Sequence, residues 1–228
     1  MNVETTKSTI IDWLSNRSRE SGTDGYVVGV SGGIDSARSE KHMEWLTEWH
    51  ENVENMTVDL TDVYESFKNL DVEQSNLALV NSRSRLRMTM LYSIANTHNL
   101  LVAGTGNKVE DYGIGFFTKY GDGGVDVSPI ADLLKSEVRT LATHLGVNEE
   151  ILTAIPTDGL WEDDRSDEDQ IGASYEELEW ALKHYDAQGP YFEALTDRQC
   201  EVLKIYIGRH LSSRHKLEPP PVCFLNGE

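Results

Sequence analysis

The residues most able to do chemistry follow a short apolar run near the N-terminus. Tyr26 to Val30 is rich in β-branched residues and predicts a buried parallel strand, because such strands are covered on both faces and stay apolar without alternating. This run leads into SGGIDS, in which two glycines allow a tight turn and Asp35 and Ser36 stand where a helix would begin. A strand, a glycine turn and a helix N-terminus together form an anion site, because free N–H groups and the helix dipole favour phosphate.

Glycines in a turn are not specific by themselves, but the full string SGGIDS is. It lacks the lysine of the GxxxxGK[ST] loop, which excludes a kinase-type phosphate cradle. The string resembles the pyrophosphate loop of the ATP pyrophosphatase superfamily, whose members split ATP into AMP and pyrophosphate while activating a carboxylate or carbonyl oxygen. The resemblance implies adenylation of a substrate rather than phosphoryl transfer.

Length and composition limit the class of protein. A chain of 228 residues with 39% hydrophobic content can bury one sizeable core, so we expect a single α/β domain over residues 1–228. No run approaches the roughly 18 apolar residues of a membrane span, and the N-terminus lacks the apolar core of a signal peptide, which predicts a cytoplasmic protein without membrane contact. The 20 basic and 39 acidic residues give a net charge of −19, which argues against nucleic acid as a partner.

Apolar runs and capping signals predict the elements that position the loop. The predicted strands beyond the first cover Val53–Leu60 and Leu100–Ala103, and the predicted helices cover Val3–Arg19, Thr61–Phe67 with Thr61 as N-cap, and Val72–His98. In open α/β sheets the ligand crevice lies at the carboxyl ends of the strands. We therefore expect Ser31 and Thr105, which each follow a strand, to converge there.

A second informative stretch follows Leu100–Ala103. It reads GTGNKVE and then GFFTKYGDGGVD, a loop of some two dozen residues without a regular pattern, and loops of that length are more often functional than not. Glu110 could hold Mg²⁺, Phe116 and Phe117 could stack on an aromatic ring, and Lys119 could bind phosphate or carboxylate. Each residue also has an ordinary interpretation as surface acid, core aromatic or solvated lysine, so the order of the residues is the specific signal.

That order resembles NAD synthetase, a family that amidates nicotinic acid adenine dinucleotide. The resemblance continues through a helix expected over Pro129–Gly146 with Leu134-Lys135, through residues 156–161 and 167–175, and to His215-Lys216, so it covers nearly the whole chain. It implies a single-domain, Rossmann-like parallel sheet with helices on both faces, of the adenine nucleotide alpha hydrolase-like type.

The resemblance also implies a ligase that forms a C–N bond. In the implied reaction the nicotinate carboxylate attacks the α-phosphorus of ATP, pyrophosphate leaves, and ammonia displaces AMP from the adenylated intermediate to give NAD. The chain has no cysteine in a nucleophile motif and no room for a glutamine-hydrolysing domain, so free ammonia is the implied nitrogen source. Some carboxylate must accept a proton from ammonia, and the sequence leaves Asp122 and Asp126 as alternatives.

Site residues are assigned by the resemblance, position by position. ATP would be bound by Gly29, Val30, Ser31, Gly32, Gly33, Ile34, Asp35, Ser36, Thr105, Lys135 and Thr157. The dinucleotide would be bound by Arg85, Lys119, Asp126, His215 and Lys216. Asp35 and Glu110 would hold Mg²⁺, and Asp35, Lys135 and Thr157 would be the catalytic residues. The family resemblance further implies an obligate homodimer in which His215 and Lys216 reach the site of the other subunit, although a frayed tail is the alternative interpretation of these two residues.

One departure from the family pattern is large. After SGGIDSA the family continues through a helix, a strand and a loop, whereas here Ala37 runs directly into Arg38. Roughly forty residues are missing by this comparison, although the span that remains still exceeds the ~10–12 residues of a crossover. Losing an internal strand would expose two sheet edges. Our hypothesis is that the natural protein carries a segment here, and an intact mass of 25.6 kDa for the expressed protein would contradict it.

Two other functions stay open from the sequence. Another amidating ATP pyrophosphatase, such as a GMP or asparagine synthetase, would share SGGIDS but not GFFTKYGDGG. A non-catalytic adenine-nucleotide-binding module would bind ATP yet release no pyrophosphate, and the gap after Ala37 makes that alternative reasonable.

Overall fold

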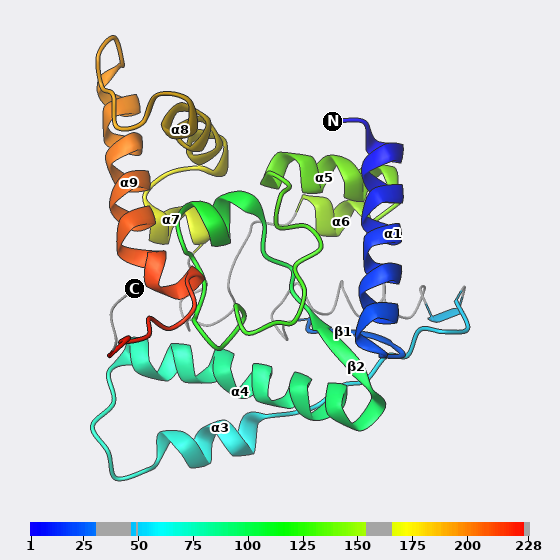
Figure 1. Ribbon diagram of the computed structural model, residues 1–228. Coiled ribbons are helices and arrows are strands. Elements are labelled where there is room, and N and C mark those ends of the chain that lie inside the picture. Colours follow the sequence, from blue (N-terminus) through cyan, green and yellow to red (C-terminus); the bar gives the residue numbers. More distant parts are fainter. Residues whose placement is uncertain (31–46, 49, 154–165, 226–228) are drawn as a thin grey trace.

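The computed structural model describes residues 1–30, 47–48, 50–153 and 166–225 (Figure 1). The loop residues 31–36 and the segment around Thr157 lie outside these ranges. The elements in chain order are α1 (Val3–Ser21), β1 (Gly25–Val28), α3 (Thr61–Lys68), α4 (Asn76–His98), β2 (Leu100–Ala103), the π-helix η1 (Lys108–Gly113), α5 (Lys135–His144), α6 (Glu149–Leu152), α7 (Asp167–Ile171), α8 (Tyr175–Gln188) and α9 (Asp197–Leu217). No helix in the described part of the chain is long and apolar enough to cross a membrane.

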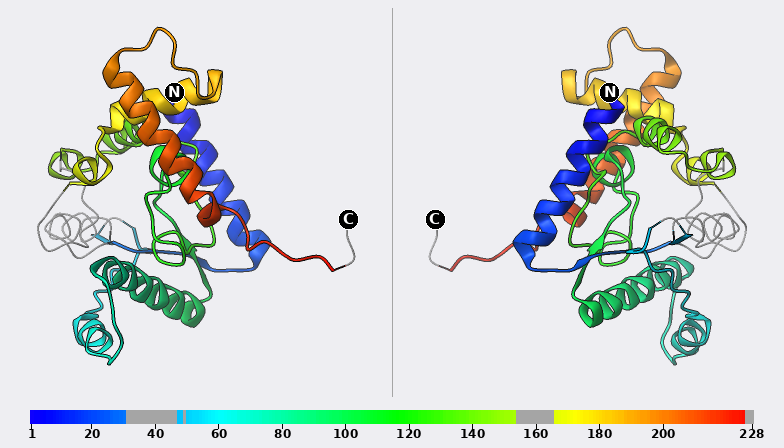
Figure 2. Two further views of the ribbon diagram at one scale, coloured as in Figure 1. Left: turned by 90° about the vertical axis from the view of Figure 1, so that its left-hand side faces the viewer. Right: turned by 90° about the vertical axis from the view of Figure 1, so that its right-hand side faces the viewer.

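A parallel pair of strands forms the centre. β1 and β2 pair from Gly25 opposite Leu100 to Val28 opposite Ala103, and Ala103 forms a further parallel bridge with Val127. The long helix α4 lies along one side of the strands, and α1 lies on the other side next to α5 (Figures 1 and 2). The predicted class, a parallel sheet with helices on both faces, is confirmed.

Two predictions about the sheet are wrong. The run from Tyr26 to Val30 is not covered on both faces, because Val28 at the end of β1 and Val30 beyond it are 50% and 54% exposed. Within the described residues β1 has one neighbouring strand, β2, so β1 is hydrogen-bonded along one edge only. Residues 53–60 form no strand in this structure, and Met56 among them is 55% exposed. An apolar, extended segment becomes a strand only when another strand offers it a hydrogen-bonding edge.

Three local predictions also need correction. Thr61 is the first residue of α3 rather than its N-cap; Leu60 holds the cap position, and the Asp59 side chain accepts from Thr61 N at 2.9 Å. α4 begins at Asn76 rather than Val72, because the Ser75 side chain caps it by accepting from Ala78 N. The loop after β2, predicted to be irregular, contains one regular element, the π-helix η1. A π-helix has no 3.6-residue period, so periodicity did not predict it.

The helical layer, which we define as η1, α7, α8 and α9, holds the main apolar core. Its fully buried members include Val109, Leu178 and Leu203, each 0% exposed. The helices begin at capping boxes, such as Ser174 with Glu177 at α8 and Thr196 with Gln199 at α9. This layer packs against the segment after η1 very closely: Gly115 has φ +60°, and a Cβ there would lie 2.1 Å from the Cβ of Ser213.

Candidate functional site

Glu110 and Lys135 meet just beyond the carboxyl end of β2. Lys135 Nζ donates to Glu110 Oε1 at 2.8 Å, and the two side chains are 22% and 14% exposed. Asn107 sets the start of η1, because its Oδ1 accepts from Val109 N at 3.0 Å and from Glu110 N at 3.1 Å. The Asn107 amide also contacts Glu110 Oε2. The GTGN turn therefore presents the Glu110 carboxylate toward a lysine that is 25 residues away in sequence.

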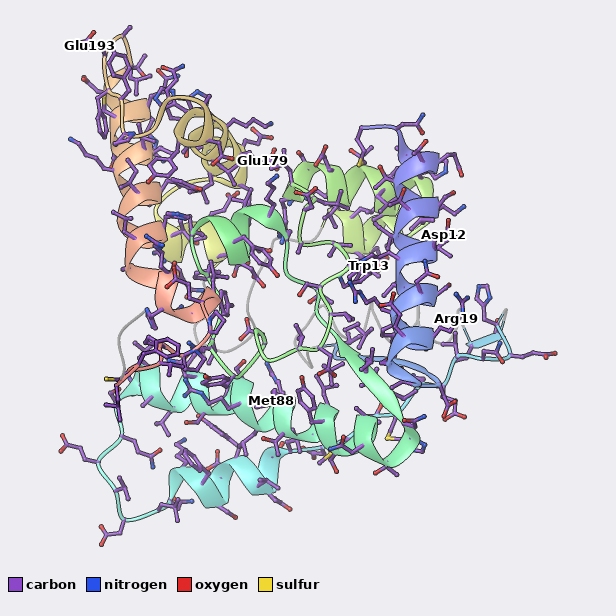
Figure 3. All side chains as sticks on the ribbon, viewed as in Figure 1. Asp12, Trp13, Arg19, Met88, Glu179 and Glu193 are labelled. Atoms are coloured by element: carbon purple, nitrogen blue, oxygen red, sulfur yellow. The ribbon has the colours of Figure 1, made fainter. Side chains whose placement is uncertain are left out.

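Lys135 is held in turn by the N-terminus of α5. Glu179 on α8 is 7% exposed, and its two carboxylate oxygens accept from Ser136 N and Ser136 Oγ, both at 2.8 Å. Figure 3 labels Glu179 where α8 faces α5. A carboxylate at a helix N-terminus is favoured by the free N–H groups and by the helix dipole. Glu179 thus fixes the end of the helix that carries Lys135 as its first residue.

Tyr175 completes this group of side chains from the start of α8. Its hydroxyl contacts Glu110 Oε1 and lies 3.0 Å from Asp167 Oδ2, and the Lys135 ammonium lies 4.7 Å from the ring centroid. Burial raises the pKa of the Tyr175 hydroxyl far above its usual value, and the charges of Glu110 and Asp167 raise it further. The phenol is therefore a hydrogen-bond donor at every physiological pH.

The next residue of η1, Asp111, carries a partly buried carboxyl group. Burial raises its pKa to about 8, and the charges of Glu110 and Asp122 raise it as well, while Lys135 and Lys216 act in the opposite direction. A Cβ on Gly106 would lie 1.8 Å from Asp111 Oδ2, so the turn before η1 has no room for a side chain there.

Four of the five residues predicted to bind the dinucleotide lie together where α9 ends against the 115–124 loop. Arg85 Nε on α4 donates to the Lys119 carbonyl at 3.3 Å, and Lys119 Nζ contacts the carbonyl of His215. Lys216 Nζ donates to the carbonyls of Gly115 and Phe117, both at 2.7 Å. Burial lowers the pKa of the Lys216 ammonium. Lys216 therefore contacts the loop of its own chain in this structure.

The fifth residue, Asp126, lies apart from that group. Its carboxylate accepts from Val102 N at 2.8 Å and from Tyr92 OH at 3.0 Å, which connects β2 to α4. The alternative proton acceptor, Asp122, accepts from Ser84 Oγ at 2.7 Å and from Thr118 N at 3.0 Å. Both carboxylates hold residues 115–126, which we call the signature loop, against α4. Asp122 and Asp126 therefore both stay candidates for the proton acceptor.

The predicted ATP-binding residues are described in part. Gly29 and Val30 leave β1 at the same end at which Gly104 and Thr105 leave β2, because the strands are parallel and Val28 pairs with Ala103. Ser31 to Ser36, including Asp35, and also Thr157 lie outside the described residues. Lys135 is the remaining predicted ATP ligand, and it lies beside Glu110 as described above.

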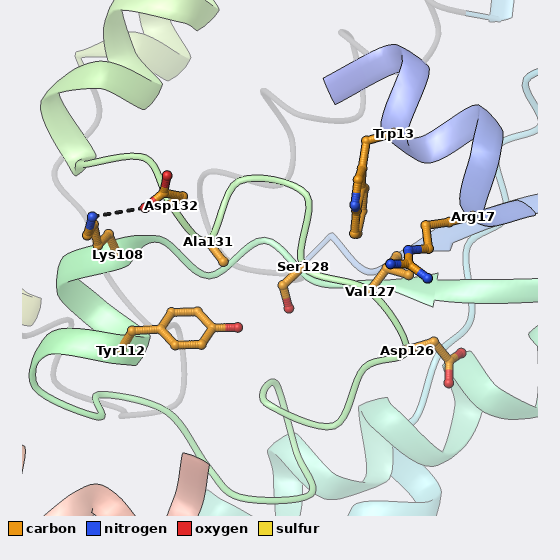
Figure 4. Close-up of a pocket in the computed structure, with 9 residues that line it drawn as sticks. All are labelled: Trp13, Arg17, Lys108, Tyr112, Asp126, Val127, Ser128, Ala131 and Asp132. Atoms are coloured by element: carbon orange, nitrogen blue, oxygen red, sulfur yellow. Dashed lines mark hydrogen bonds and ion pairs between the residues drawn. The ribbon is translucent and has the colours of Figure 1, made fainter. Parts of the chain in front are cut away.

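A pocket of about 700 Å³ opens between α1, η1 and the segment after β2 (Figure 4). Its lining includes Trp13 and Arg17 from α1 and Tyr112 from η1, but neither Glu110 nor Lys135. The cations at this pocket are paired, because Lys108 bonds to Asp132 at 2.9 Å and Arg17 bonds to Glu20 at 2.9 Å. We therefore place the candidate site at the Glu110–Lys135 pair and not in this pocket.

Sequence reasoning missed the roles of three residues in the site. The role of Asn107 could have been predicted from the sequence, because Asn107 precedes Glu110 by three residues. At that spacing a helix-capping residue contacts a later side chain. Tyr175 ends a segment that the family resemblance covers but had no assigned role, and Glu179 carried no local signal; they lie 65 residues from Glu110 and 43 residues from Ser136. The fold alone brings them to the site.

Known proteins match the chain over most of its length. A family model described as NAD synthase matches residues 38–220. The NH(3)-dependent NAD(+) synthetase of Carboxydothermus hydrogenoformans is 34% identical over 255 aligned positions, covering 99% of each chain. The protein of the same name from Archaeoglobus fulgidus is 36% identical and covers 98% of each chain. Among solved structures, NMN synthetase from Francisella tularensis has a TM-score of 0.79 at 29% identity, covering 98% of this chain and 99% of that chain.

The alignment with the Carboxydothermus protein is longer than the chain itself. It extends over 255 positions against 228 residues, so at least 255 − 228 = 27 aligned positions have no residue here. The family model, moreover, begins to match at residue 38, immediately after Ala37. A missing segment after Ala37 stays a prediction, and these two observations are the reasons to test it.

Proposed function

The chain belongs to the NAD synthase family, and on that premise we propose that it amidates nicotinic acid adenine dinucleotide to NAD with ATP and ammonia. Membership confirms the family that the motifs predict, and it favours this function over a GMP or asparagine synthetase. The observation that supports the proposal best is the Glu110–Lys135 pair, placed at 2.8 Å where the parallel strands end. That edge of the sheet is where α/β enzymes bind nucleotides.

In this reaction the protein mainly has to position the substrates and to stabilise the charge that develops. The nicotinate carboxylate of the substrate is the nucleophile, so no protein nucleophile is needed and correct placement supplies much of the rate. Negative charge develops on pyrophosphate as it leaves. Lys135 would stabilise that charge together with the N–H groups of the loop at residues 31–36. Ammonia then displaces AMP, with Asp122 or Asp126 as the proposed proton acceptor.

Magnesium fits the donor chemistry around Glu110. Within the described ranges no group of three or more His, Cys, Asp and Glu side chains could hold a metal ion. That suits Mg²⁺, which is usually held by one or two carboxylates together with substrate phosphates rather than by an all-protein cage. We propose Glu110 and Asp35 as these carboxylates. The ion would neutralise charge on the departing pyrophosphate.

We further propose that the protein acts as a cytoplasmic homodimer. Large apolar side chains are exposed along α3, the turn after it and the start of α4, with Val63 at 51%, Leu70 at 55% and Leu77 at 59%. Contiguous exposed apolar surface is typical of a protein–protein interface. Light scattering after size exclusion should give the mass of two chains, and Leu70→Glu should reduce it to one. A monomeric wild type would contradict the homodimer.

The experiment that tests the function combines purified protein with the dinucleotide, ATP, Mg²⁺ and ammonium, and measures NAD and AMP. Equal amounts of both products are expected. Glu110→Gln and Lys135→Met should each lower kcat at least about 100-fold, the scale of losing one charge-stabilising group. Lys108→Met is the matched control, because Lys108 is 39% exposed and pairs with the surface residue Asp132.

Other outcomes of this assay have definite meanings. AMP without NAD would keep the adenylating chemistry and reopen the substrate. Neither product, from folded protein, would favour the non-catalytic nucleotide-binding module. An intact mass larger than 25.6 kDa for the natural protein would identify the missing segment as the cause.

A second substrate is worth the same assay, because the Francisella tularensis structure is that of an NMN synthetase. Nicotinic acid mononucleotide is the dinucleotide without its adenylate half, and the amidated carboxylate is the same. We expect the dinucleotide to have the higher kcat/KM. A higher value for the mononucleotide would reassign the substrate and leave the mechanism unchanged.

A further inference from the structure

Tyr175 contacts both members of the Glu110–Lys135 ion pair through chemically separate groups. Its hydroxyl contacts Glu110 Oε1, the same oxygen that accepts from Lys135 Nζ at 2.8 Å. Its ring face lies below the Lys135 ammonium, 4.7 Å from centroid to nitrogen. A single side chain thus holds the carboxylate by a hydrogen bond and the ammonium by a cation–π contact.

The position of Tyr175 is itself strongly determined. It is 3% exposed and is the first residue of α8, directly after the Ser174 cap. Its backbone N–H donates to Glu168 Oε1 at 2.9 Å, and its hydroxyl lies 3.0 Å from Asp167 Oδ2. Ring, backbone and hydroxyl are therefore all held by contacts within the chain itself.

The hydroxyl has one proton to donate but faces two carboxylates, Glu110 and Asp167. When both carboxyl groups are ionised, one of them approaches the phenol oxygen without a hydrogen between them, which is unfavourable unless a positive charge is near. Lys135 supplies such a charge in this structure. The same geometry holds Glu110 in a place where an added cation would also be stabilised.

We propose that Tyr175 is a positioning residue for the amidation: its hydroxyl fixes the Glu110 carboxylate for Mg²⁺, and its ring fixes the Lys135 ammonium for the phosphates of ATP. This rests on the proposed roles of Glu110 and Lys135. It predicts that the two effects can be separated, because phenylalanine removes the hydroxyl and keeps the ring, whereas leucine removes both.

The test measures binding rather than turnover. Mn²⁺ affinity is read by electron paramagnetic resonance in the presence of α,β-methylene-ATP, which cannot release pyrophosphate, and affinity for the metal-free nucleotide is read by calorimetry. Tyr175→Phe should weaken Mn²⁺ binding about tenfold or more, the usual effect of removing a group that orients a metal ligand. Metal-free nucleotide affinity should be unchanged in Tyr175→Phe and reduced in Tyr175→Leu.

Tyr206 offers a matched control. It is 2% exposed and belongs to the same core cluster, but it lies on α9 and stacks on His210. Tyr206→Phe removes one buried hydroxyl from the same layer and should leave both affinities at the wild-type value. Circular dichroism establishes that each variant is folded.

The proposal would be overturned if folded Tyr175→Phe bound Mn²⁺ as tightly as the wild type. It would also be overturned if Tyr206→Phe lowered Mn²⁺ affinity as much as Tyr175→Phe does. Should Tyr175→Phe fail to fold, Tyr175→Leu tests the same contact, because it also removes the hydroxyl that faces Glu110; unchanged Mn²⁺ affinity there would also overturn the proposal. The binding assay does not depend on NAD formation. A wild type that makes no NAD, together with weakened Mn²⁺ binding in Tyr175→Phe, would reject the proposed function but keep Tyr175 as the residue that positions the Glu110 carboxylate for a metal ion.

Discussion

The sheet layer of this protein, β1 and β2, differs sharply in packing from the helical layer of η1, α7, α8 and α9. In the helical layer Leu178, Val202 and Leu203 are at most 1% exposed. In the sheet layer Val102 is 0% exposed, but Val28 at the end of β1 is 50% exposed. The two layers carry different halves of the candidate site. Glu110 and Tyr175 belong to the helical layer and Lys135 begins α5 beside it, whereas β1 leads to residues 31–36, the predicted phosphate loop.

The difference in packing between the two layers corresponds to a difference between this chain and its relatives. The helical layer is closed by its own side chains, and the residues that position Glu110 come from it, from α5 and from the turn before η1, where Asn107 lies. β1 has one paired edge within the described residues, and at least 27 aligned positions of the Carboxydothermus protein have no residue here. We therefore expect the metal and lysine half of the site to form more robustly than the phosphate half.

The largest expected effect comes from matched valine substitutions in the two layers. Val202→Ala removes two buried methyl groups from α9 and should lower the free energy of unfolding by about 2 kcal/mol, including the cavity that remains. Val28→Ala in half-exposed β1 should cost less than about 1 kcal/mol. Urea unfolding followed by circular dichroism measures both. Equal losses would mean that further chain covers β1, and the contrast between the layers would not hold.

A smaller effect is expected where the helical layer holds the signature loop. Lys216→Met keeps the apolar stem but leaves the carbonyls of Gly115 and Phe117 without their charged donor, at a cost of about 1–1.5 kcal/mol. Lys204→Met, on the exposed side of the same helix, should stay within about 0.5 kcal/mol of wild type. The same urea assay compares them. A neutral Lys216→Met would show that α4, through Asp122 and Ser84, is sufficient to hold the loop.

The smallest effect concerns the surface contact between α8 and α9. Arg198 hydrogen-bonds Glu177 at 2.7 Å and thereby lowers the pKa of Glu177 to about 2, aided by Ser174 at the helix cap. Because the folded pKa lies below the usual 4.5, this contact stabilises the fold above about pH 4.5 and the contribution is lost as pH falls toward 2.

Arg198→Gln should therefore lower the urea midpoint slightly at pH 6 and not at all near pH 2. The effect is small because Arg198 and Glu177 are 46% and 33% exposed, so water screens the pair. A difference from wild type of the same size at both pH values would mean that Arg198 acts through packing instead of through charge.

The sequence predicted elements whose signals are local. The helix predicted over Val3–Arg19 as an amphipathic run extends over Val3–Ser21, and the strand predicted over Leu100–Ala103 as an apolar run is confirmed. Residues 53–60 show the limit of such signals: the run is suited to a strand, yet a strand also needs a neighbouring edge, and no local pattern reports whether that edge exists.

The site shows the same division between local and non-local information. Glu110 and Lys135 were identified by their motifs, and the structure brings them within 2.8 Å of each other. Tyr175 and Glu179 support them from a helix that begins 40 residues after Lys135, and only the packed helical layer makes these contacts. Their contribution depends on tertiary structure, which periodicity and spacing do not encode.

The close approach of Gly115 to Ser213 has a consequence for how these proteins can vary in evolution. Position 115 requires glycine for two reasons. Its φ is positive, and a Cβ at this position would lie only 2.1 Å from the Cβ of Ser213. A larger residue at 213 would force the loop away from α9 even with glycine at 115. Relatives that keep this loop in place should therefore show only glycine, alanine or serine at 213, and a bulkier residue there should appear together with a rearranged signature loop. Two positions almost a hundred residues apart in sequence are thus constrained as one.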